Sequence, residues 1–235
     1  MLFVANLIFH PSKREVESMF VDRTDAGKKL AQAVIHYKGL PAVVYALPRG
    51  GVVVGVEVAR ILQAPFDLIL VRKIGHPLAR EYAIGAVAED GYIVINPAET
   101  ASLEKAWIEA AAAAELKEAQ RQRALFLRGR TPIDVNDRVA IVVDDGLATG
   151  LTMQAAIHEI RRREPQKLVV AVPVAAAETV NKLRPEVDDF VVLYIPGGCF
   201  GAVGSFYQYF DQVSDDEVVA IMWKEPQKAQ EAQQG

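Results

Sequence analysis

The 235-residue sequence contains one cysteine, no apolar run of membrane-spanning length and no excess of positive charge. A single cysteine, Cys199, excludes an internal disulfide, and we expect it to be a small core residue. No apolar run approaches the roughly 18 residues that cross a bilayer. The net charge of −4 argues against nucleic acid as the main partner, because nucleic acids select basic surfaces. We therefore expect a cytoplasmic protein with no membrane and no nucleic-acid partner.

The two ends of the chain differ from its body. The first nine residues are apolar, but they lack a basic segment and a small-residue cleavage site, so they predict neither a signal peptide nor an anchor. Met19 begins a segment with the character of a natural start, and we expect residues 1–18 to be a loose extension. The polar residues 224–235 predict a disordered tail. The folded domain is then expected over residues 19–223.

Apolar strand-like runs alternate with helix-like segments along the body of the chain. This alternation predicts an α/β fold, with a mainly parallel sheet and helices on both faces. The strand-like runs are residues 42–47, 66–71, 139–143, 167–174 and 190–195, and the helical patterns cover 24–37, 52–62, a stretch ending near 163, and 178–183. Residues 83–88 and 92–95 predict a hairpin that turns at Glu89-Asp90-Gly91.

The segment from Ser102 to Arg128 contains neither glycine nor proline. Its alanine, glutamate, leucine, lysine and arginine residues predict a long helix capped by Ser102. The run of alanines predicts close packing against another surface, and a second subunit is one candidate. We therefore expect a helical insertion over residues 99–130 and a homodimer.

The most informative segment joins the run 139–143 to the next helix. Free backbone N–H groups in its small-residue loop and the positive end of the helix dipole favour an anion. Its carboxylates suit the vicinal hydroxyls of a ribose, and the absence of lysine excludes a Walker A loop. The segment therefore predicts a site for ribose 5-phosphate, with a ligand-free acidic turn as the alternative. It reads Asp144-Asp145-Gly146-Leu147-Ala148-Thr149-Gly150-Leu151-Thr152.

This segment resembles the motif with which type I phosphoribosyltransferases bind 5-phosphoribosyl-1-diphosphate (PRPP). In that family the acidic pair holds the ribose 2- and 3-hydroxyls, which assigns this role to Asp144 and Asp145. The loop 148–152 would hold the 5-phosphate. Gly146 departs from the pattern, because the family usually has an aliphatic residue there. The resemblance also implies Mg²⁺, held through substrate oxygens and water, with Asp144 and Asp145 contacting it only through water.

The resemblance continues on both sides of this motif, over about residues 20–219. Residues 47–51, Leu-Pro-Arg-Gly-Gly, stand where the family places its pyrophosphate loop. Gly50 and Gly51 let the backbone approach an anion, and Arg49 can pair with phosphate oxygens. The family often has a strained peptide in this loop, and the resemblance places it at Arg49-Gly50.

Residues 72–82 resemble the flexible loop that closes over the transition state in this family. Arg72, Lys73 and Arg80 suit a pyrophosphate leaving group, and a solvated basic loop is the alternative. Gly75 and Pro77 in this segment argue against regular structure.

Two separate segments, 19–23 and 196–212, could together form a hood over the acceptor. In the second, Phe200, Phe206 and Tyr207 could stack on a planar acceptor. Filling of the core below the loop is the alternative for these three aromatics. In the first, Asp22 and Arg23 are expected to form an ion pair at the start of a helix.

The resemblance implies an enzyme that moves ribosyl 5-phosphate from PRPP to a nitrogen nucleophile, such as a nucleobase, with release of pyrophosphate. The residues assigned to catalysis are Arg49, Lys73, Asp144 and Asp145. The residues assigned to PRPP binding are these four with Gly50, Gly51, Arg72, Gly146, Leu147, Ala148, Thr149, Gly150, Leu151 and Thr152. Two alternatives stay open, a non-catalytic sensor of PRPP or nucleotides and a hydrolase of a phosphorylated ribose compound. The sequence does not identify the acceptor.

Overall fold

The computed structural model describes residues 19–231, apart from the side chains of Arg80, Glu81 and residues 224–231. The predictions for the extension 1–18 and for the Arg80 side chain lie outside this part of the chain. Among the described residues, no helix is long and apolar enough to cross a membrane.

The centre of the domain is a five-stranded sheet whose strands are all parallel. Its order is β2 (Phe66–Leu68), β1 (Ala42–Ala46), β6 (Val139–Val143), β7 (Lys167–Val174) and β8 (Asp189–Tyr194). Every residue of β1 and β6 is buried, which explains their continuous apolar sequence, since both faces of the sheet are covered. Strand β2, the next in the chain, pairs with one edge of β1, whereas β6 pairs with the other edge. This reversal opens a crevice beyond the carboxyl ends of β1 and β6.

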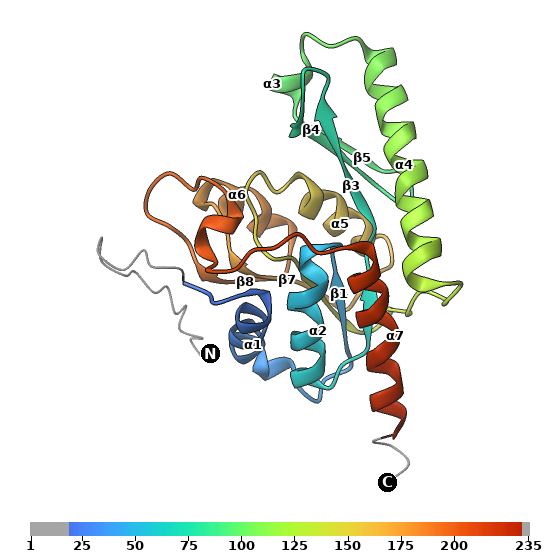
Figure 1. Ribbon diagram of the computed structural model, residues 1–235, viewed down its shortest axis with the longest axis vertical. Helices are drawn as coiled ribbons and strands as arrows, with labels where there is room; N and C mark the ends of the chain where they lie inside the picture. The colour runs from blue at the N-terminus through green and yellow to red at the C-terminus, as the bar shows by residue number, and fades with distance from the viewer. Residues whose placement is uncertain (1–18, 232–235) are drawn as a thin grey trace.

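Helices cover both faces of the sheet, as predicted (Figure 1). On one face lie α1 (Arg23–Ala33) and α2 (Gly50–Leu62), with Leu30 and Val58 in the core. On the other lie α5 (Leu151–Arg161) and α6 (Ala177–Leu183). Three short 3-10 helices complete this layer structure at Ile35–Tyr37, Arg184–Glu186 and Val203–Phe206. The first of them follows α1, so the α-helix is shorter than the predicted 24–37.

A second, antiparallel sheet stands beside the main one, with strands β3 (Val71–His76), β4 (Ala79–Ala88) and β5 (Ile93–Ile95) (Figure 1). The β4–β5 hairpin confirms the sequence prediction. The predicted irregular loop over 72–82 is wrong, because β3 and β4 form a hairpin there. Gly75 lies at a register shift of this ladder and Pro77 lies in the turn, where neither interrupts strand pairing.

The predicted insertion is helical, as α3 (Pro97–Thr100) followed by α4 (Lys105–Leu127). Ser102 is not the N-cap of α4, because Glu104 occupies that position and Ser102 lies in the preceding turn. Within the alanine run, Ala112 is buried among Ile74, Ile84 and Val87 of the antiparallel sheet, whereas Ala110, Ala113 and Ala114 are exposed. The homodimer remains a prediction.

The C-terminal helix α7 (Asp215–Glu231) packs beside the end of α4. Trp223 Nε1 donates a hydrogen bond to the carbonyl of Phe126 at 3.0 Å. The predicted disordered tail is wrong for residues 224–231, which continue the helix. Apart from Pro226, these residues are lysine, glutamate, glutamine and alanine, which have high helix propensity.

A cluster of buried charges joins the antiparallel sheet to the main domain. Arg123 of α4 donates to Glu89 at the end of β4, and Arg163 pairs with both Glu89 and Glu159 of α5. Burial raises the pKa of Glu89 above its ordinary value, and it raises the pKa of Glu159 to about 7. Glu159 is 3% exposed, so its ionised form is poorly solvated despite its arginine partner.

The raised pKa of Glu159 predicts a pH dependence of stability. The folded protein holds a proton on Glu159 up to about pH 7, whereas the unfolded chain releases it near 4.5. Stability from this group is therefore present below pH 4.5 and is lost as the pH rises to 7. At roughly 1.4 kcal/mol per pKa unit, the difference between 4.5 and about 7 corresponds to a loss of about 3–4 kcal/mol over the whole range.

Urea unfolding of the wild-type protein and of Glu159→Gln between pH 5 and 8 measures this effect. The stability of the wild type should fall relative to the variant across this range. Glu109→Gln removes an exposed carboxylate from α4 and should leave the pH profile of the wild type unchanged. Parallel profiles for wild type and Glu159→Gln would contradict the prediction.

Candidate active site

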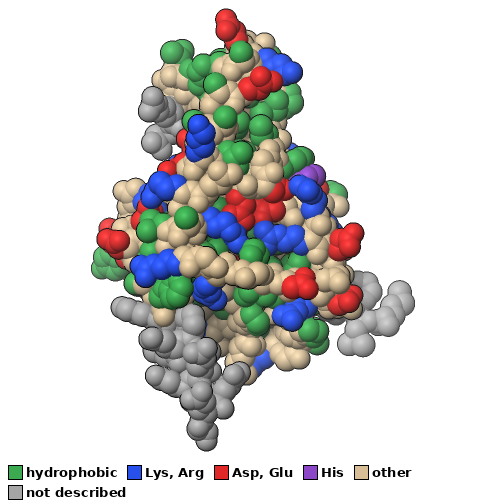
Figure 2. Space-filling model, turned by 90° about the vertical axis from the view of Figure 1, so that its right-hand side faces the viewer, with side chains coloured by type: hydrophobic (Ala, Val, Ile, Leu, Met, Phe, Trp, Pro, Cys, Tyr) green, Lys and Arg blue, Asp and Glu red, His purple; other side chains and the backbone are tan. Residues whose placement is uncertain are grey.

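A cavity of about 930 Å³ lies beyond the carboxyl ends of β1 and β6. Figure 2 shows acidic side chains flanked by basic ones between the upper lobe and the body of the molecule. The cavity walls come from the loops after β1 and β6, the β3–β4 hairpin, helix α4 and the segment 203–212. Its polar lining includes Arg23, Arg49, Arg72, Lys73, His76, Glu115, Asp144, Asp145, Thr149, Thr152 and Gln212.

The loop after β6 forms a turn that places backbone N–H groups at the cavity. Leu147 is buried and fixes the turn, since its N–H donates to the Val174 carbonyl and its carbonyl accepts from Ala176. Gly150 has a φ of 73°, a left-handed conformation that favours glycine, and α5 begins at the next residue. The start of α5 therefore faces the cavity with the unpaired N–H groups of a first helical turn.

The structure brings the predicted residues 144–152 together, but they contribute differently. Ala148 and Thr149 are exposed and Thr152 is half-buried, and all three line the cavity. The side chain of Leu151 is buried in the core with that of Leu147. The two leucines therefore contribute backbone position, not side-chain contacts, to the turn.

The two carboxylates after β6 differ in their surroundings. The Oδ1 atom of Asp144 accepts from the Asp145 N–H at 2.8 Å. Burial raises the pKa of Asp144 well above its usual range, and the negative charge of Asp145 raises it further. The positive charges of Lys73 and Arg23 oppose this rise. The pair is therefore short of positive charge and suited to a ligand that brings hydroxyl donors or a cation.

Asp145 has an ion-pair partner that the sequence did not predict. The Nε atom of Arg23, the first residue of α1, donates to Asp145 Oδ2 at 2.7 Å. The expected pair between Asp22 and Arg23 is wrong. Asp22 instead caps α1 by accepting from the N–H of Asp25 at 2.7 Å.

The loop after β1 packs directly on these carboxylates. A Cβ atom on Gly50 would lie 1.8 Å from Asp145 Oδ2, and one on Gly51 would lie 3.0 Å from the Cα of Asp144. A side chain at Gly50 would displace the Asp145 carboxylate, and one at Gly51 would press on the backbone at Asp144. A cis peptide bond occurs in this loop at Pro48-Arg49, one bond before the expected Arg49-Gly50.

The basic side chains assigned to pyrophosphate reach the same cavity from two elements, the loop before α2 and strand β3. Arg49 begins the turn into α2, with its Nη1 atom 3.7 Å from Asp215 of α7. Arg72 of β3 pairs with Glu115 of α4 at 3.0 Å. Lys73 is exposed at the cavity wall (its neighbours there include His76 and Pro77 of the hairpin). These cations can bind an anion that displaces or joins their acidic partners.

The two hood segments do meet, since the N–H of Phe20 donates to Phe206 and the N–H of Gln208 donates to Phe20. Phe206 and Tyr207 are buried among Phe20 and Val174, and neither lines the cavity. The core-filling alternative therefore holds for these two aromatics. Phe200 packs against the same cluster, at 5.2 Å from the ring of Phe206.

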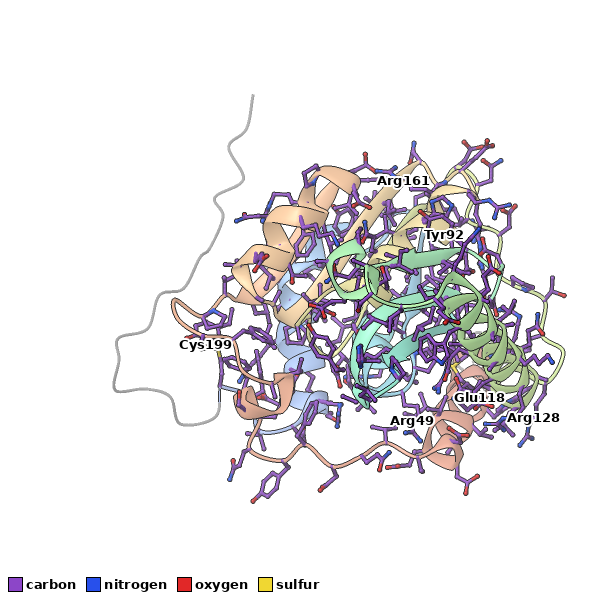
Figure 3. The ribbon with its side chains drawn as sticks, turned by 90° about the horizontal axis from the view of Figure 1, so that it is seen from above. Arg49, Tyr92, Glu118, Arg128, Arg161 and Cys199 are labelled. Atoms are coloured by element: carbon purple, nitrogen blue, oxygen red, sulfur yellow. The ribbon has the colours of Figure 1, made fainter. Side chains whose placement is uncertain are left out.

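Several cavity residues were missed by the sequence analysis. Phe210 lines the cavity where Phe206 and Tyr207 do not, and α4 contributes Trp107 and Glu115. Nothing in the local pattern separates Phe210 from its aromatic neighbours. Cys199, expected in the core, is exposed on the loop of the second hood segment (Figure 3).

The acidic side chains of the cavity are its candidate ligands for a metal ion. No group of three or more histidine, cysteine, aspartate or glutamate side chains that could hold a metal ion occurs in the described part of the chain. Asp144 and Asp145 supply carboxylate oxygens of the kind that Mg²⁺ prefers. The chemistry of these two side chains thus fits a Mg²⁺ ion.

Comparison with known proteins gives relatives over most of the chain. A Mycobacterium tuberculosis protein provisionally named a phosphoribosyl transferase is 44% identical over 206 residues, which are 87% of this chain and 46% of that protein. The chain thus spans about half the length of this curated relative. A Thermus thermophilus protein of known crystal structure is 40% identical, with a TM-score of 0.71 over 86% of this chain and 97% of that chain.

A uracil phosphoribosyltransferase of Mycoplasma genitalium is 38% identical over 65 residues, 26% of this chain and 32% of that protein. The model of the phosphoribosyl transferase domain matches residues 21–207. The matched region contains the sheet, the turn into α5 and the loop after β1. The chain therefore belongs to the phosphoribosyl transferase domain family.

Proposed function

We propose that this chain binds PRPP together with Mg²⁺ and transfers its ribosyl 5-phosphate to a nitrogen nucleophile, with release of pyrophosphate. The observation that carries this proposal is the shared cavity. A turn with free backbone N–H groups, a carboxylate pair and four cationic side chains line one cavity of about 930 Å³. Family membership and the arrangement of these groups support PRPP as the ligand.

The turn after β6 would hold the ribose 5-phosphate. Its free N–H groups and the hydroxyls of Thr149 and Thr152 donate hydrogen bonds, and the start of α5 adds the positive end of the helix dipole. The carboxylates of Asp144 and Asp145 would accept hydrogen bonds from the ribose 2- and 3-hydroxyls. Asp144 and Asp145 are the residues that would hold Mg²⁺, which would supply positive charge to offset the charge of the leaving pyrophosphate.

Arg49, Arg72 and Lys73 would hold the pyrophosphate. In the reaction the bond from C1 to the pyrophosphate oxygen breaks, the oxygen keeps the electron pair, and a nitrogen lone pair forms the new bond to C1. The nitrogen then loses its proton to solvent. Charge grows on the leaving group as the bond breaks, so cations placed there favour the transition state over bound PRPP.

The ribose assignment predicts the effect of removing either carboxylate. Asp144→Asn and Asp145→Asn should each weaken PRPP binding at least tenfold in calorimetry, because a charged hydrogen bond contributes roughly 1.5–3 kcal/mol and tenfold is about 1.4. Asp137→Asn makes the same change at an exposed position and should bind like the wild type. Unchanged affinity in both cavity variants would exclude the ribose assignment.

The pyrophosphate assignment predicts a separation of turnover from binding. Lys73→Ala should lower kcat by about tenfold or more and weaken PRPP binding by less, since the charge that Lys73 faces increases in the transition state. Lys117→Ala removes an exposed lysine from α4 and serves as the matched control. Nucleobases and amines are screened first, by pyrophosphate release from PRPP with Mg²⁺.

The same screen distinguishes an enzyme from a sensor. PRPP binding without pyrophosphate release for any acceptor would favour the non-catalytic sensor. A Lys73→Ala variant that is unchanged in both affinity and turnover would place Lys73 on a solvated surface and remove it from the site.

A further inference from the structure

Arg23 lines the cavity but belongs to neither the turn after β6 nor the loop after β1, because it is the first residue of α1. Its side chain is 11% exposed and that of its partner Asp145 is 15% exposed. Besides the 2.7 Å bond to Asp145, its Nη1 atom donates to the Asp211 carbonyl at 2.7 Å. Its guanidinium carbon lies 3.7 Å from the centre of the Phe210 ring. The guanidinium is therefore held at its edge by two hydrogen bonds and on its face by the Phe210 ring.

Asp145 is enclosed from the other sides as well. Gly50 lies so close to Oδ2 that no side chain fits between the loop after β1 and the carboxylate. The hydroxyl of Tyr207 donates to the backbone carbonyl of Asp145 at 2.6 Å. The Asp145 carboxylate thus takes its orientation from Arg23 while its backbone is held by the second hood segment.

Arg23 also supplies positive charge beside the two carboxylates. Three titratable groups surround the Asp144–Asp145 pair. They are Arg23 from α1, Lys73 from β3 and the hydroxyl of Tyr207 from the second hood segment. Lys73 is exposed, whereas Arg23 is nearly buried, so Arg23 is the partner less screened by solvent. Without it, two adjacent carboxylates would repel each other in a poorly solvated site.

We propose that Arg23 is a positioning residue for the ribose of PRPP. It holds one oxygen of Asp145, which leaves the other to accept from a ligand hydroxyl, and it connects this carboxylate to the hood through Asp211 and Phe210. This inference rests on the proposed function, because it assigns a ribose to Asp145. Arg23 acts through Asp145 and does not itself need to contact the ligand.

A double-mutant cycle tests the action through Asp145. PRPP affinity is measured by calorimetry with Mg²⁺ for the wild type, Arg23→Gln, Asp145→Asn and the double variant. Arg23→Gln should weaken binding about tenfold alone but less than about threefold when Asp145 is already asparagine, because coupled residues are not additive. Arg23→Lys keeps the charge and should recover part of the affinity.

The control is Lys28→Gln, which removes a positive charge from an exposed position of α1 and should bind PRPP like the wild type. Thermal unfolding of each variant shows that the fold is kept. Equal losses from Arg23→Gln in both backgrounds would mean a general structural role and would overturn the inference. Tighter binding by Arg23→Gln would mean that Arg23 competes with the ribose, which also overturns it. A wild-type protein that does not bind PRPP overturns the proposed function together with this inference.

Discussion

The site depends on the contact between two loops that follow neighbouring strands. Because β1 and β6 pair in the sheet, the loop at Gly50 meets the carboxylate at Asp145 with no room for a side chain. This contact fixes how far the loop after β1 can lie from the turn into α5. A pyrophosphate site and a ribose phosphate site must stay at a set separation if one ligand is to occupy both. The pairing of β1 with β6 sets the distance between the two loops, and Gly50 allows that distance to be short.

A second constraint is electrostatic. In this structure Arg49 faces Asp215, Arg72 pairs with Glu115, and Asp145 pairs with Arg23. Side chains with partners are already oriented, so less conformational entropy is lost when a ligand arrives. The exposed pairs contribute little to stability by themselves, because solvent screens them. Their partners lie on α4 and α7, so these two helices help to set the geometry of the cavity although they lie outside the two loops.

The features predicted correctly from the sequence are those whose signal is local. Examples are the strand 139–143 with the acidic turn that follows it, and the β4–β5 hairpin. In each, about a dozen consecutive residues carry the pattern that predicts the structure. One failed prediction depended on a contact distant in sequence, whereas the other concerned a local hairpin. Arg23 and Asp145 are 122 positions apart, so the adjacent Asp22 was the only partner that local reasoning could offer. The loop at 72–82 contains two residues that disfavour strands, yet pairing with β4 tolerates one in a bulge and the other in a turn.

Helix α4 shows why family membership alone leaves the acceptor open. The helix packs on the antiparallel sheet through Ala112 and, on the adjoining surface, presents Trp107, Ala114 and Glu115 to the cavity. An insertion that only stabilised the sheet would need the first surface and not the second. Its carboxylate instead engages Arg72, one of the cations assigned to pyrophosphate. The insertion thus forms one wall of the cavity and bears on what the cavity can hold.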